Sequence, residues 1–381
     1  MKVLFVTTNW PRPDLPIDGI FVREHARAAA LSADVRVLHL ERSVGRTGLA
    51  ETESVAGEEP PTLRIRYRRF GKPVSLAAFV GGPFAAYRRL RREGFEPDVL
   101  HANSHLSALP ALALGRLYRK PVVYSEHWSA FLPDNPAELA GGMRALARIA
   151  LRGADVVLPV SEAMRRALEA AGSPKGTVVV PNVVDERLFR PGGEREPGLL
   201  LTAGMLGENQ AKGVDYLLRA VALVDGVRLD VVGEGPLRAD YERLARELEI
   251  DERVQFHGFL PKPELAERMR RAELFVLASR FENNPCVVLE AMASGLPVVA
   301  TRVGGLPELV DETSGILAEP GDPESIAARI GEALDRSFDR AAIARRATER
   351  YGREAVGAAL SAVYEEVVAR KTSPRQRAAA R

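Results

Sequence analysis

Short apolar runs alternate with longer amphipathic segments along most of the chain. Most runs are nearly continuous in Val and Leu, as in residues 274–278 (LFVLA), and such runs are typical of parallel strands covered on both faces. The segments between them, such as 22–33, 236–248 and 285–294, have the polar and apolar spacing of helices. This alternation predicts doubly wound α/β sheets.

The predicted strands form two groups, separated by residues 186–198 (ERLFRPGGEREPG), which are rich in Gly, Pro and charge and have no periodicity. The first group is 2–8, 35–40, 63–70, 98–103, 121–127, 155–161 and 177–182. The second group is 198–204, 227–233, 254–259, 274–279, 297–301 and 315–319. A chain of 381 residues is also longer than one typical core requires.

We therefore predict two Rossmann-like domains that face each other across a cleft. The first spans 1–185 and the second 199–350, with 186–198 as the linker. An amphipathic helix over 351–370 is predicted to cross back to the first domain, and 371–381 to form a disordered tail.

The composition favours a soluble globular protein. Hydrophobic residues make up 46% of the chain and charged residues 27%. Cys286 is the only cysteine, which excludes a disulfide framework and a cysteine metal site. The N-terminus runs directly into a strand pattern and then meets Asn9 and Pro11, unlike a signal peptide, and no apolar run approaches the ~18 residues of a membrane helix. We expect a cytoplasmic protein.

The net charge of +2 conceals one basic segment. Residues 62–92 contain no acidic residue and nine basic ones: Arg64, Arg66, Arg68, Arg69, Lys72, Arg88, Arg89, Arg91 and Arg92. Between the two clusters, residues 73–87 are uncharged and mostly apolar. This stretch is too short to span a bilayer, but it could rest in the interface of an anionic membrane. A basic solvated face explains the same pattern, and the sequence leaves both interpretations open.

The α/β pattern would permit a dinucleotide-binding protein, but the glycine fingerprint is incomplete. The nearest match, residues 232–238 (VGEGPLR), has Gly233 and Gly235 but places Arg238 where a third glycine would allow close helix packing. No phosphate-loop motif of the form GxxxxGKS or GxxxxGKT is present. The sequence therefore argues against a dehydrogenase and against an NTPase.

The most informative segment is 279–301 (SRFENNPCVVLEAMASGLPVVAT), which reads as the end of a strand, a turn, a short helix and a second strand. Asn283 and Asn284 are good helix N-caps, and Pro285 suits the first helical position. The helix is expected to stop at Gly295, where a left-handed turn can end it.

Two carboxylates, Glu282 and Glu290, stand eight positions apart across this turn. A ligand at the carboxyl end of the first strand would meet Glu282, two amide side chains and the N–H groups of a helix N-terminus. That combination suits a phosphate together with sugar hydroxyls.

Further motifs lie before and after this segment, and their order along the chain is informative. In the second half they are LTAGML (201–206) with Lys212 and Gly213, VVGEGP (231–236), VQFHGF (254–259) and GGLPE (304–308). In the first half they are GIFV (19–22), SEH (125–127), VSE (160–162) and PNVVD (181–185). With these motifs in this order, nearly the whole chain strongly resembles the retaining glycosyltransferases of family four, which have the GT-B fold of two facing Rossmann-like domains.

The resemblance implies transfer of a sugar, with retention at the anomeric carbon, from a UDP- or GDP-sugar to an acceptor hydroxyl. Such enzymes stabilise the departing diphosphate with fixed positive charge, which is commonly the largest catalytic contribution. Here Lys212 and the helix N-termini after Asn284 and near Gly19 would supply that charge. No metal and no cofactor is then implied. Together with the basic segment 62–92, the resemblance favours a glycan or lipid-linked acceptor in cell-envelope polysaccharide or glycolipid synthesis.

The resemblance also assigns residues to the site. His127, Lys212 and Glu282 are the implied catalytic residues, with His127 shaping the reacting face of the donor sugar. Glu290 would accept hydrogen bonds from the ribose hydroxyls, and Glu282 would hold hydroxyls of the sugar. The implied donor-binding residues are Gly19, Met205, Lys212, Phe259, Leu260, Glu282, Asn283, Asn284 and Glu290, with the base near Phe259 and Leu260.

One position departs from the family pattern. Many relatives have an arginine directly after the glycine that ends the first strand of the second domain, whereas this chain has Met205. The diphosphate would then meet one cation fewer, unless Arg280 compensates.

Two other functions fit the same scaffold: a nucleotide-sugar epimerase and a non-catalytic sugar-nucleotide binding protein. Among the histidines, His101 and His105 are open between a functional and a structural role, while His25, His39 and His257 are interpreted as structural.

Overall fold

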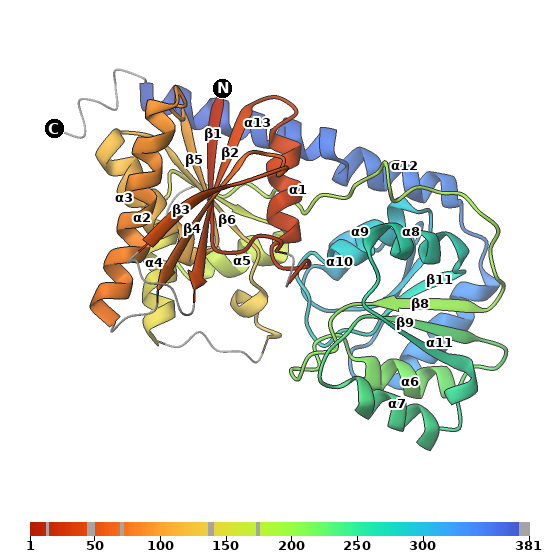
Figure 1. The fold of residues 1–381 in the computed structure, drawn as a ribbon. Helices are drawn as coiled ribbons and strands as arrows, with labels where there is room; N and C mark the ends of the chain where they lie inside the picture. The colour runs from red at the N-terminus through yellow and green to blue at the C-terminus, as the bar shows by residue number, and fades with distance from the viewer. Residues whose placement is uncertain (13–14, 44–49, 69–71, 136–140, 173–175, 373–381) are drawn as a thin grey trace. The chain divides into compact units, whose positions relative to one another are not determined.

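The computed structural model describes residues 1–12, 15–43, 50–68, 72–135, 141–172 and 176–372. These residues form two compact units (Figure 1). The first unit contains the described residues up to 131, those from 141 to 182 and those from 353 to 372. The second unit contains 132–135 and 183–352. Residues 373–381, most of the predicted disordered tail, lie outside the described part of the chain.

The first unit is built on a seven-stranded sheet with the order β3-β4-β2-β1-β5-β6-β7. Its pairs are parallel except for β3 with β4. The strands are β1 (Lys2–Thr7), β2 (Asp34–Ser43), β3 (Ala50–Val55), β4 (Thr62–Arg68), β5 (Val99–Asn103), β6 (Val122–Glu126) and β7 (Val156–Pro159). All residues of β5, β6 and β7 are buried, as expected for strands covered on both faces.

Helices cover both faces of this sheet. They are α1 (Ile20–Ala29), α2 (Lys72–Arg92), α3 (His105–Tyr118), α4 (Gly141–Gly153), α5 (Glu162–Ala170) and α13 (Arg353–Thr372), with a 3-10 turn at Ser129–Phe131. The chain moves one way from β1 to β2 and the other way from β5 to β6. Right-handed crossovers therefore place α1, with α13 packed on it, on one face, and α2, α3 and α4 on the other (Figure 1).

The last helix, α13, is held in the first unit by three specific contacts. Arg353 donates a hydrogen bond to Glu24 of α1 at 2.7 Å. A β-carbon on Gly357 would lie 2.5 Å from the carbonyl oxygen of Ala28, so this glycine lets the two helices touch. The buried hydroxyl of Tyr364 lies 2.6 Å from Nδ1 of His101 on β5. These contacts explain why the last described residues of the chain belong with the first.

In the first half, one predicted strand is wrong and one observed strand was missed, so the predicted number agrees with the observed sheet only by coincidence. The apolar run 177–182 forms only an isolated bridge between Thr177 and Val157. The edge strand β3 was not predicted, because its sequence AETESV lacks an apolar face. It forms instead through an antiparallel ladder in which Glu51 stands opposite Arg66 and Glu53 opposite Arg64.

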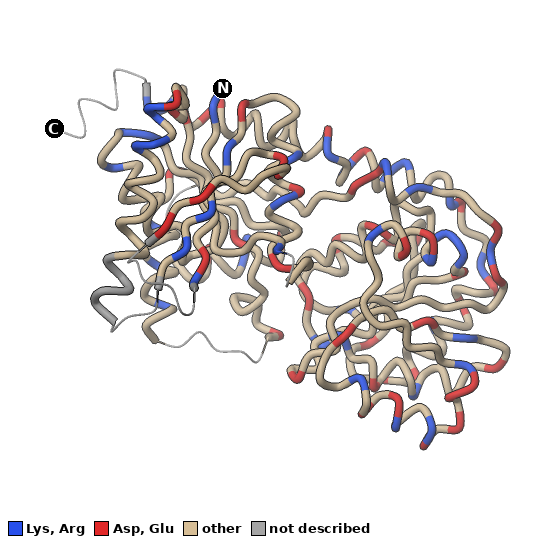
Figure 2. Tube along the Cα trace, in the orientation of Figure 1, with Lys and Arg blue, Asp and Glu red and all other residues tan. Residues whose placement is uncertain are grey.

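The basic segment 62–92 is more structured than its composition suggests. Arg64 and Arg66 of β4 form ion pairs with Glu41 and Glu53, and Figure 2 shows acidic positions beside basic ones on these strands. The segment continues into α2, where the described apolar side chains Ala78, Phe79, Ala86, Tyr87 and Leu90 are buried in the protein. None of the helices that the structure describes combines the length and apolarity needed to cross a bilayer.

The second unit has a six-stranded, entirely parallel sheet with the order β10-β9-β8-β11-β12-β13. The strands are β8 (Leu199–Ala203), β9 (Arg228–Val232), β10 (Val254–Gly258), β11 (Leu274–Leu277), β12 (Val298–Thr301) and β13 (Gly315–Ala318). The helices are α6 (Val214–Ala222), α7 (Arg238–Glu247), α8 (Lys262–Arg271), α9 (Cys286–Ala293), α10 (Leu306–Leu309), α11 (Pro323–Asp335) and α12 (Arg340–Tyr351), with a 3-10 turn at Asp251–Arg253.

Alternate residues of the central strands feed two separate cores. Leu201 and Phe275 point into a core shared with α8, α9 and α12. Leu200 and Leu274 point into a core shared with α6, α7 and α11. The period-two alternation of a strand thus explains why near-continuous apolar runs are needed here.

Residues 186–198, predicted as a linker, pack as part of the second unit. Phe189 is 2% exposed and lies in the core of α8, α9 and α12. The backbone N–H of Glu196 donates to the carbonyl of Arg271 at 2.9 Å, and that of Gly198 donates to the carboxylate of Glu273. The aromatic ring inside this polar segment is the feature that anchors it.

Candidate functional site

The strand order of the second sheet reverses between β8 and β11. In an open parallel sheet, ligands bind outside the carboxyl ends of the strands at such a reversal. The loop after β8 carries Gly204, Met205 and Lys212, and the loop after β11 carries residues 279–284. The topology therefore brings most of the predicted donor-binding residues to one edge of this sheet.

Lys212 reaches across from the β8 loop to the β11 loop. A β-carbon on Gly204 would lie 2.8 Å from Cε of Lys212, so the missing side chain makes room for the lysine stem. The next residue, Gly213, precedes α6 with φ at +57°, and a β-carbon there would lie 1.9 Å from the carbonyl oxygen of Ala278. These close approaches bring the ammonium of Lys212 to Oε1 of Glu282, to which it donates a hydrogen bond.

Glu282 is held from several sides. Its side chain is 11% exposed, and the Ser279 hydroxyl donates to the same Oε1 at 3.1 Å. The carbonyl of Ser279 in turn accepts a hydrogen bond from Thr301 at the end of β12, at 2.6 Å. A carboxylate held in this way beside an ammonium can accept hydrogen bonds from sugar hydroxyls while the cation faces a phosphate.

The helix after this turn begins later than predicted. Its first residue is Cys286, and Pro285 occupies the N-cap position, so the prediction of an Asn cap followed by a first-turn proline is wrong. Pro285 has φ −70° and ψ 120°, an extended conformation that ends the turn. Asn283 and Asn284 lie before the helix and are each 5% exposed. Their burial places them inside the turn that holds Glu282.

Glu290 lies in the second turn of α9 and is 4% exposed. Lys262, at the start of α8, donates a hydrogen bond to its Oε1, and the same ammonium lies 5.4 Å from the ring centre of Phe189. Sequence reasoning did not single out Lys262. The available signal was its position just after the predicted base site at 259–260.

The other residues predicted to bind the donor or to compensate for Met205 have side chains that are exposed, partly buried or held by another residue of the protein. Met205 is 58% exposed and Phe259 is 47% exposed, while Leu260 is partly buried. Arg280 donates two hydrogen bonds of 2.8 Å to Asp215, and its guanidinium lies 4.2 Å from the ring centre of Tyr216. The hydrogen bonds to Asp215 raise the pKa of Arg280 further. Because Asp215 holds this guanidinium, the structure gives no support to Arg280 as a substitute for the cation missing at 205.

The incomplete glycine fingerprint has a structural explanation. Gly233 has φ at +145°, and a β-carbon there would lie 1.8 Å from the carbonyl oxygen of Gly204. A glycine is therefore required at position 233 for the loop after β9 to contact the loop after β8. Arg238, at the third fingerprint position, donates to Glu242 at 2.8 Å and to the carbonyl of Phe256 at 3.2 Å. This arginine ties α7 to the end of β10.

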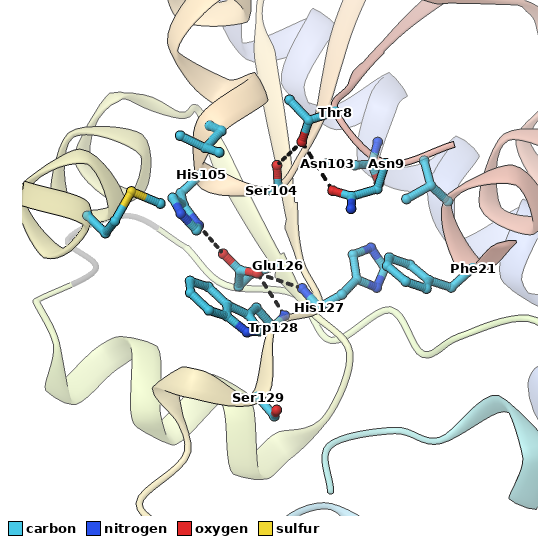
Figure 3. A pocket seen from close by; sticks show the side chains of 13 residues that line it. Thr8, Asn9, Phe21, Asn103, Ser104, His105, Glu126, His127, Trp128 and Ser129 are labelled. Carbon is cyan, nitrogen blue, oxygen red and sulfur yellow. Dashed lines mark hydrogen bonds and ion pairs between the residues drawn. The ribbon is translucent and has the colours of Figure 1, made fainter. Parts of the chain in front are cut away.

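The first unit has a pocket of about 390 Å³ at the corresponding reversal, between β1 and β5 (Figure 3). This volume is in the range of small-molecule sites. Its wall is formed by residues at or just after the ends of β1, β5 and β6, by the first turns of α1 and α3 and by α4. They are Thr8, Asn9, Phe21, Val22, Asn103, Ser104, His105, Leu106, Glu126, His127, Trp128, Ser129 and Met143. Gly19 precedes α1 with φ at +63°, and a β-carbon on it would lie 2.3 Å from the backbone of Asn9.

His127 enters this pocket from the end of β6. Its Nδ1 lies 3.2 Å from Oδ1 of Asn182, and its ring centre lies 4.5 Å from that of Phe21 and 5.2 Å from that of His25. Burial, and secondarily the charge of His25, hold the pKa of His127 well below its usual value. At neutral pH the ring is therefore uncharged and can act as a hydrogen-bonding wall of the pocket.

Glu126 holds the same loop in place through hydrogen bonds. From the sequence, this residue was identified only as part of the SEH motif. Its Oε1 accepts hydrogen bonds from the backbone N–H groups of His127 and Trp128 at 2.9 and 2.8 Å. The Tyr124 hydroxyl donates to its Oε2. Nδ1 of His105 lies 3.6 Å from the same oxygen (Figure 3). The carboxylate thus fixes three of the residues that line the pocket or support it.

The other histidines divide between pocket and core. His105 lines the pocket, with its ring stacked on Trp128 at 5.3 Å. His101 is fully buried and lies 2.7 Å from the Ser125 hydroxyl and 2.6 Å from the Tyr364 hydroxyl. His25 lies 2.8 Å from the carbonyl of Pro181, and burial lowers its pKa to about 4. His257 lies 2.9 Å from Asp230.

The predicted residues thus fall into two groups. Lys212, Glu282, Asn283, Asn284, Glu290, Met205, Phe259 and Leu260 lie at the carboxyl edge of the second sheet, and His127 and Gly19 lie at that of the first. Among the described residues, no group of three or more His, Cys, Asp or Glu side chains is placed to hold a metal ion. Independence from metal stays a prediction.

Known protein families match both halves of the chain. Residues 19–188 match the family model described as Glycosyltransferase Family 4, and residues 197–336 match the one described as Glycosyl transferases group 1. The first match includes His127 and Gly19, and the second includes Lys212, Glu282 and Glu290.

Individual relatives agree with these matches. The D-inositol 3-phosphate glycosyltransferase 1 of Catenulispora acidiphila is 33% identical over 349 residues, which cover 79% of this chain and 82% of the relative. The sulfoquinovosyl transferase SQD2 of Arabidopsis thaliana is 31% identical over 282 residues, or 68% of this chain. The match spans 54% of the length of SQD2.

A solved structure of similar fold matches nearly the whole chain. The crystal structure of Anabaena Alr3699/HepE in complex with UDP has a TM-score of 0.74, with 21% identity, and the match covers 96% of this chain and 100% of that one. The predicted fold class, two doubly wound α/β domains of the GT-B type, is confirmed.

Proposed function

We propose that this chain, which belongs to glycosyltransferase family 4, transfers a sugar from a nucleotide diphosphate sugar to an acceptor hydroxyl, with retention at the anomeric carbon and without a metal ion. The observation that carries the proposal is the hydrogen bond from Lys212 to Glu282 at the reversal between β8 and β11. It joins a cation suited to a phosphate with a carboxylate suited to sugar hydroxyls.

The proposed reaction uses this pair directly. An oxygen of the acceptor hydroxyl bonds to the anomeric carbon, while the bond from that carbon to the phosphate oxygen breaks and the diphosphate leaves with the electron pair. The acceptor proton passes to the departing phosphate. Lys212 opposes the growing negative charge, and a cation fixed in advance loses no free energy to reorganisation at that moment.

The donor half of the proposal rests on several supports. The carboxyl edge of the second sheet holds Glu290 for the ribose and the exposed Phe259 for the base. The neighbour HepE was solved with UDP, which supports a uridine or similar nucleotide as the carrier. Lys262 donates a hydrogen bond to Glu290. When the donor binds, the ribose hydroxyls would have to displace this ammonium or share the carboxylate with it.

The second half of the proposal concerns the acceptor, which we place in the first unit. We propose that the reaction serves polysaccharide or glycolipid synthesis and takes place at the inner face of the cell membrane. The relatives include a D-inositol 3-phosphate glycosyltransferase and a sulfoquinovosyl transferase. Arg88, Arg91 and Arg92 of α2 are exposed and could contact anionic headgroups. Vesicles rich in anionic lipid should sediment the protein at low salt, and neutralising these arginines should abolish the effect. Sedimentation that the substitutions leave unchanged would remove the membrane from the proposal.

The whole proposal is tested by a panel of UDP- and GDP-sugars. Thermal shift first identifies the donor, since a ligand at a hundred times its Kd stabilises by ~2.7 kcal/mol. Proton NMR of the product with glycan or polyol acceptors then gives the anomeric configuration, with and without EDTA. We expect a retained configuration and unchanged rates in EDTA. An inverted product, loss of activity in EDTA, or epimerised donor without acceptor would contradict the proposal.

A further inference from the structure

The pocket of the first unit contains a buried amide that the protein itself does not use. Asn103, the last residue of β5, is 1% exposed and lines the pocket. Neither its Oδ1 nor its Nδ2 has a hydrogen-bond partner among the described residues. Buried polar groups are nearly always satisfied, and one left unsatisfied costs stability. A carboxamide in this state can pair with a ligand that brings both a donor and an acceptor.

The neighbouring groups match the same kind of ligand. The hydroxyls of Thr8 and Ser104 lie 3.2 Å apart at the pocket wall, and Nε2 of His105 has no partner among the described residues (Figure 3). Trp128 is 43% exposed and is backed by the ring of His105. An indole supported from behind is a flat apolar surface, and hydroxyl-bearing rings have an apolar face of C–H groups that packs on such surfaces.

The charge of the lining argues against a phosphate. Of the thirteen described residues that line the pocket, none is Lys or Arg. The acidic Glu126 is 1% exposed within the same wall. A phosphate carries charge that needs a cation or several donors when water is removed, and a nearby carboxylate repels it.

We propose that this pocket binds a neutral polyhydroxylated acceptor, an unphosphorylated sugar or polyol, with two adjacent hydroxyls on Asn103 and its ring face on Trp128. One hydroxyl donates to Oδ1 of Asn103 while the next accepts from Nδ2, so that a vicinal diol satisfies both atoms of the amide. This inference rests on the proposed function, because it takes the occupant to be the sugar acceptor. It goes further by giving the acceptor's class at the reacting end.

Tryptophan fluorescence reads the pocket directly. The chain contains two tryptophans; Trp128 lines the pocket and is 43% exposed, whereas Trp10 is 0% exposed and is not a lining residue, so we assign a change on binding to Trp128. The full chain is titrated with matched pairs: glucose with glucose 6-phosphate, and inositol with inositol 3-phosphate. We expect a saturable change with a neutral member, and binding at least about tenfold weaker for its phosphorylated partner. No variant is needed for this comparison.

Asn103→Leu separates binding from folding. Because Asn103 lacks partners within the protein, an apolar residue of similar size should leave the melting temperature unchanged or raise it. The same substitution should weaken binding of the neutral member by about ten- to hundredfold. The matched control is Ser107→Ala, outside the pocket lining, where a buried hydroxyl donates to the carbonyl of Asn103 at 2.7 Å. It should lower the melting temperature and leave sugar binding intact.

The outcomes separate this inference from the proposed function. Phosphorylated members that bind as tightly as neutral ones, no saturable change with any neutral member, or unaltered binding by Asn103→Leu would each overturn the neutral-acceptor site. Nucleotide binding is measured on the same sample by thermal shift. If no nucleotide sugar binds while a neutral sugar does, the donor half of the proposed function fails and the pocket assignment stands.

Discussion

Gly304 lies so close to Glu282 that a β-carbon on it would be 1.8 Å from the carbonyl oxygen of that residue. Its φ is +49°, a left-handed conformation that L-residues with side chains rarely adopt. The glycine after β12 is therefore a packing condition for the turn that carries Glu282. The glutamate and the glycine pair of segment 279–308 are therefore packed against each other in one turn structure.

Gly304→Ala should consequently lower stability and displace Glu282. The expected loss is at least ~2 kcal/mol, from backbone strain and from the clash with the carbonyl. Urea unfolding measures it. Gly331→Ala is the matched control, because Gly331 lies inside α11 with nothing within 4 Å of its added β-carbon. The control should gain ~0.5–1 kcal/mol from helix propensity. Equal effects at the two positions would refute the packing argument.

Met205→Arg should strengthen donor binding. Met205 is 58% exposed beside the glycine that accommodates Lys212, so an arginine there would add a second cation at the proposed diphosphate site. Calorimetric titration with the identified nucleotide should show a Kd lower by about fivefold, or ~1 kcal/mol. The gain should shrink at high salt.

The control for added charge is Leu223→Arg. Leu223 is 60% exposed and caps the opposite end of α6 from Lys212. If Leu223→Arg improved nucleotide binding as much as Met205→Arg, the effect would be one of net charge and the diphosphate would lie elsewhere.

The pair Lys262 and Glu290 should contribute to stability more than surface ion pairs do. Removing the ammonium in Lys262→Met leaves a carboxylate that is 4% exposed without that partner, at an expected cost of ~1–3 kcal/mol. The double variant with Glu290→Leu should recover much of this loss but bind no nucleotide. The same cycle on Arg329 and Glu332, whose side chains are 46% and 47% exposed, should give less than ~1 kcal/mol. Equal coupling energies in the two cycles would be inconsistent with a buried ribose-binding carboxylate.

Acid should destabilise the first unit through its buried histidines. Burial lowers the pKa of His25 to about 4 in the folded protein, against about 6.5 when unfolded. Protonation therefore favours the unfolded chain, and the stability that His25 provides above pH 6.5 is lost as pH falls toward 4, by up to ~3 kcal/mol. Chemical unfolding across this range measures the slope. His25→Gln, which can still donate to Pro181, should flatten it, and an unchanged slope would exclude His25 as the source.

The buried strands and the order of motifs were predictable because parallel strands covered on both faces require continuous apolar runs. Residues 274–279 and 297–301 became β11 and β12 within two residues of the predicted limits. The same reasoning failed where burial does not decide the structure. β3 is held by Glu–Arg pairs along a sheet edge, and the apolar run 177–182 is excluded from the sheet apart from one bridge.

The site was predictable in its residue types but not in its contacts. Lys212 and Glu282 are 70 positions apart, and nothing local indicates that Gly204 and Gly213 fold the lysine onto the carboxylate. Lys262 and Asn103 were missed for a related reason. Pairing with Glu290 and the absence of partners for a buried amide are properties of the packed structure, whereas the sequence shows only a lysine after a proline and an asparagine at a strand end.

The most direct test of the central claim is the rate of sugar transfer by Lys212→Gln with the identified donor and acceptor. We expect kcat to fall by about 10²–10³, because the cation acts on charge that develops in the transition state. The control Arg329→Gln, on an exposed pair of α11, should match the unmodified chain. A folded Lys212→Gln protein with a kcat within about twofold of the control, well short of the loss expected from a transition-state cation, would contradict the account.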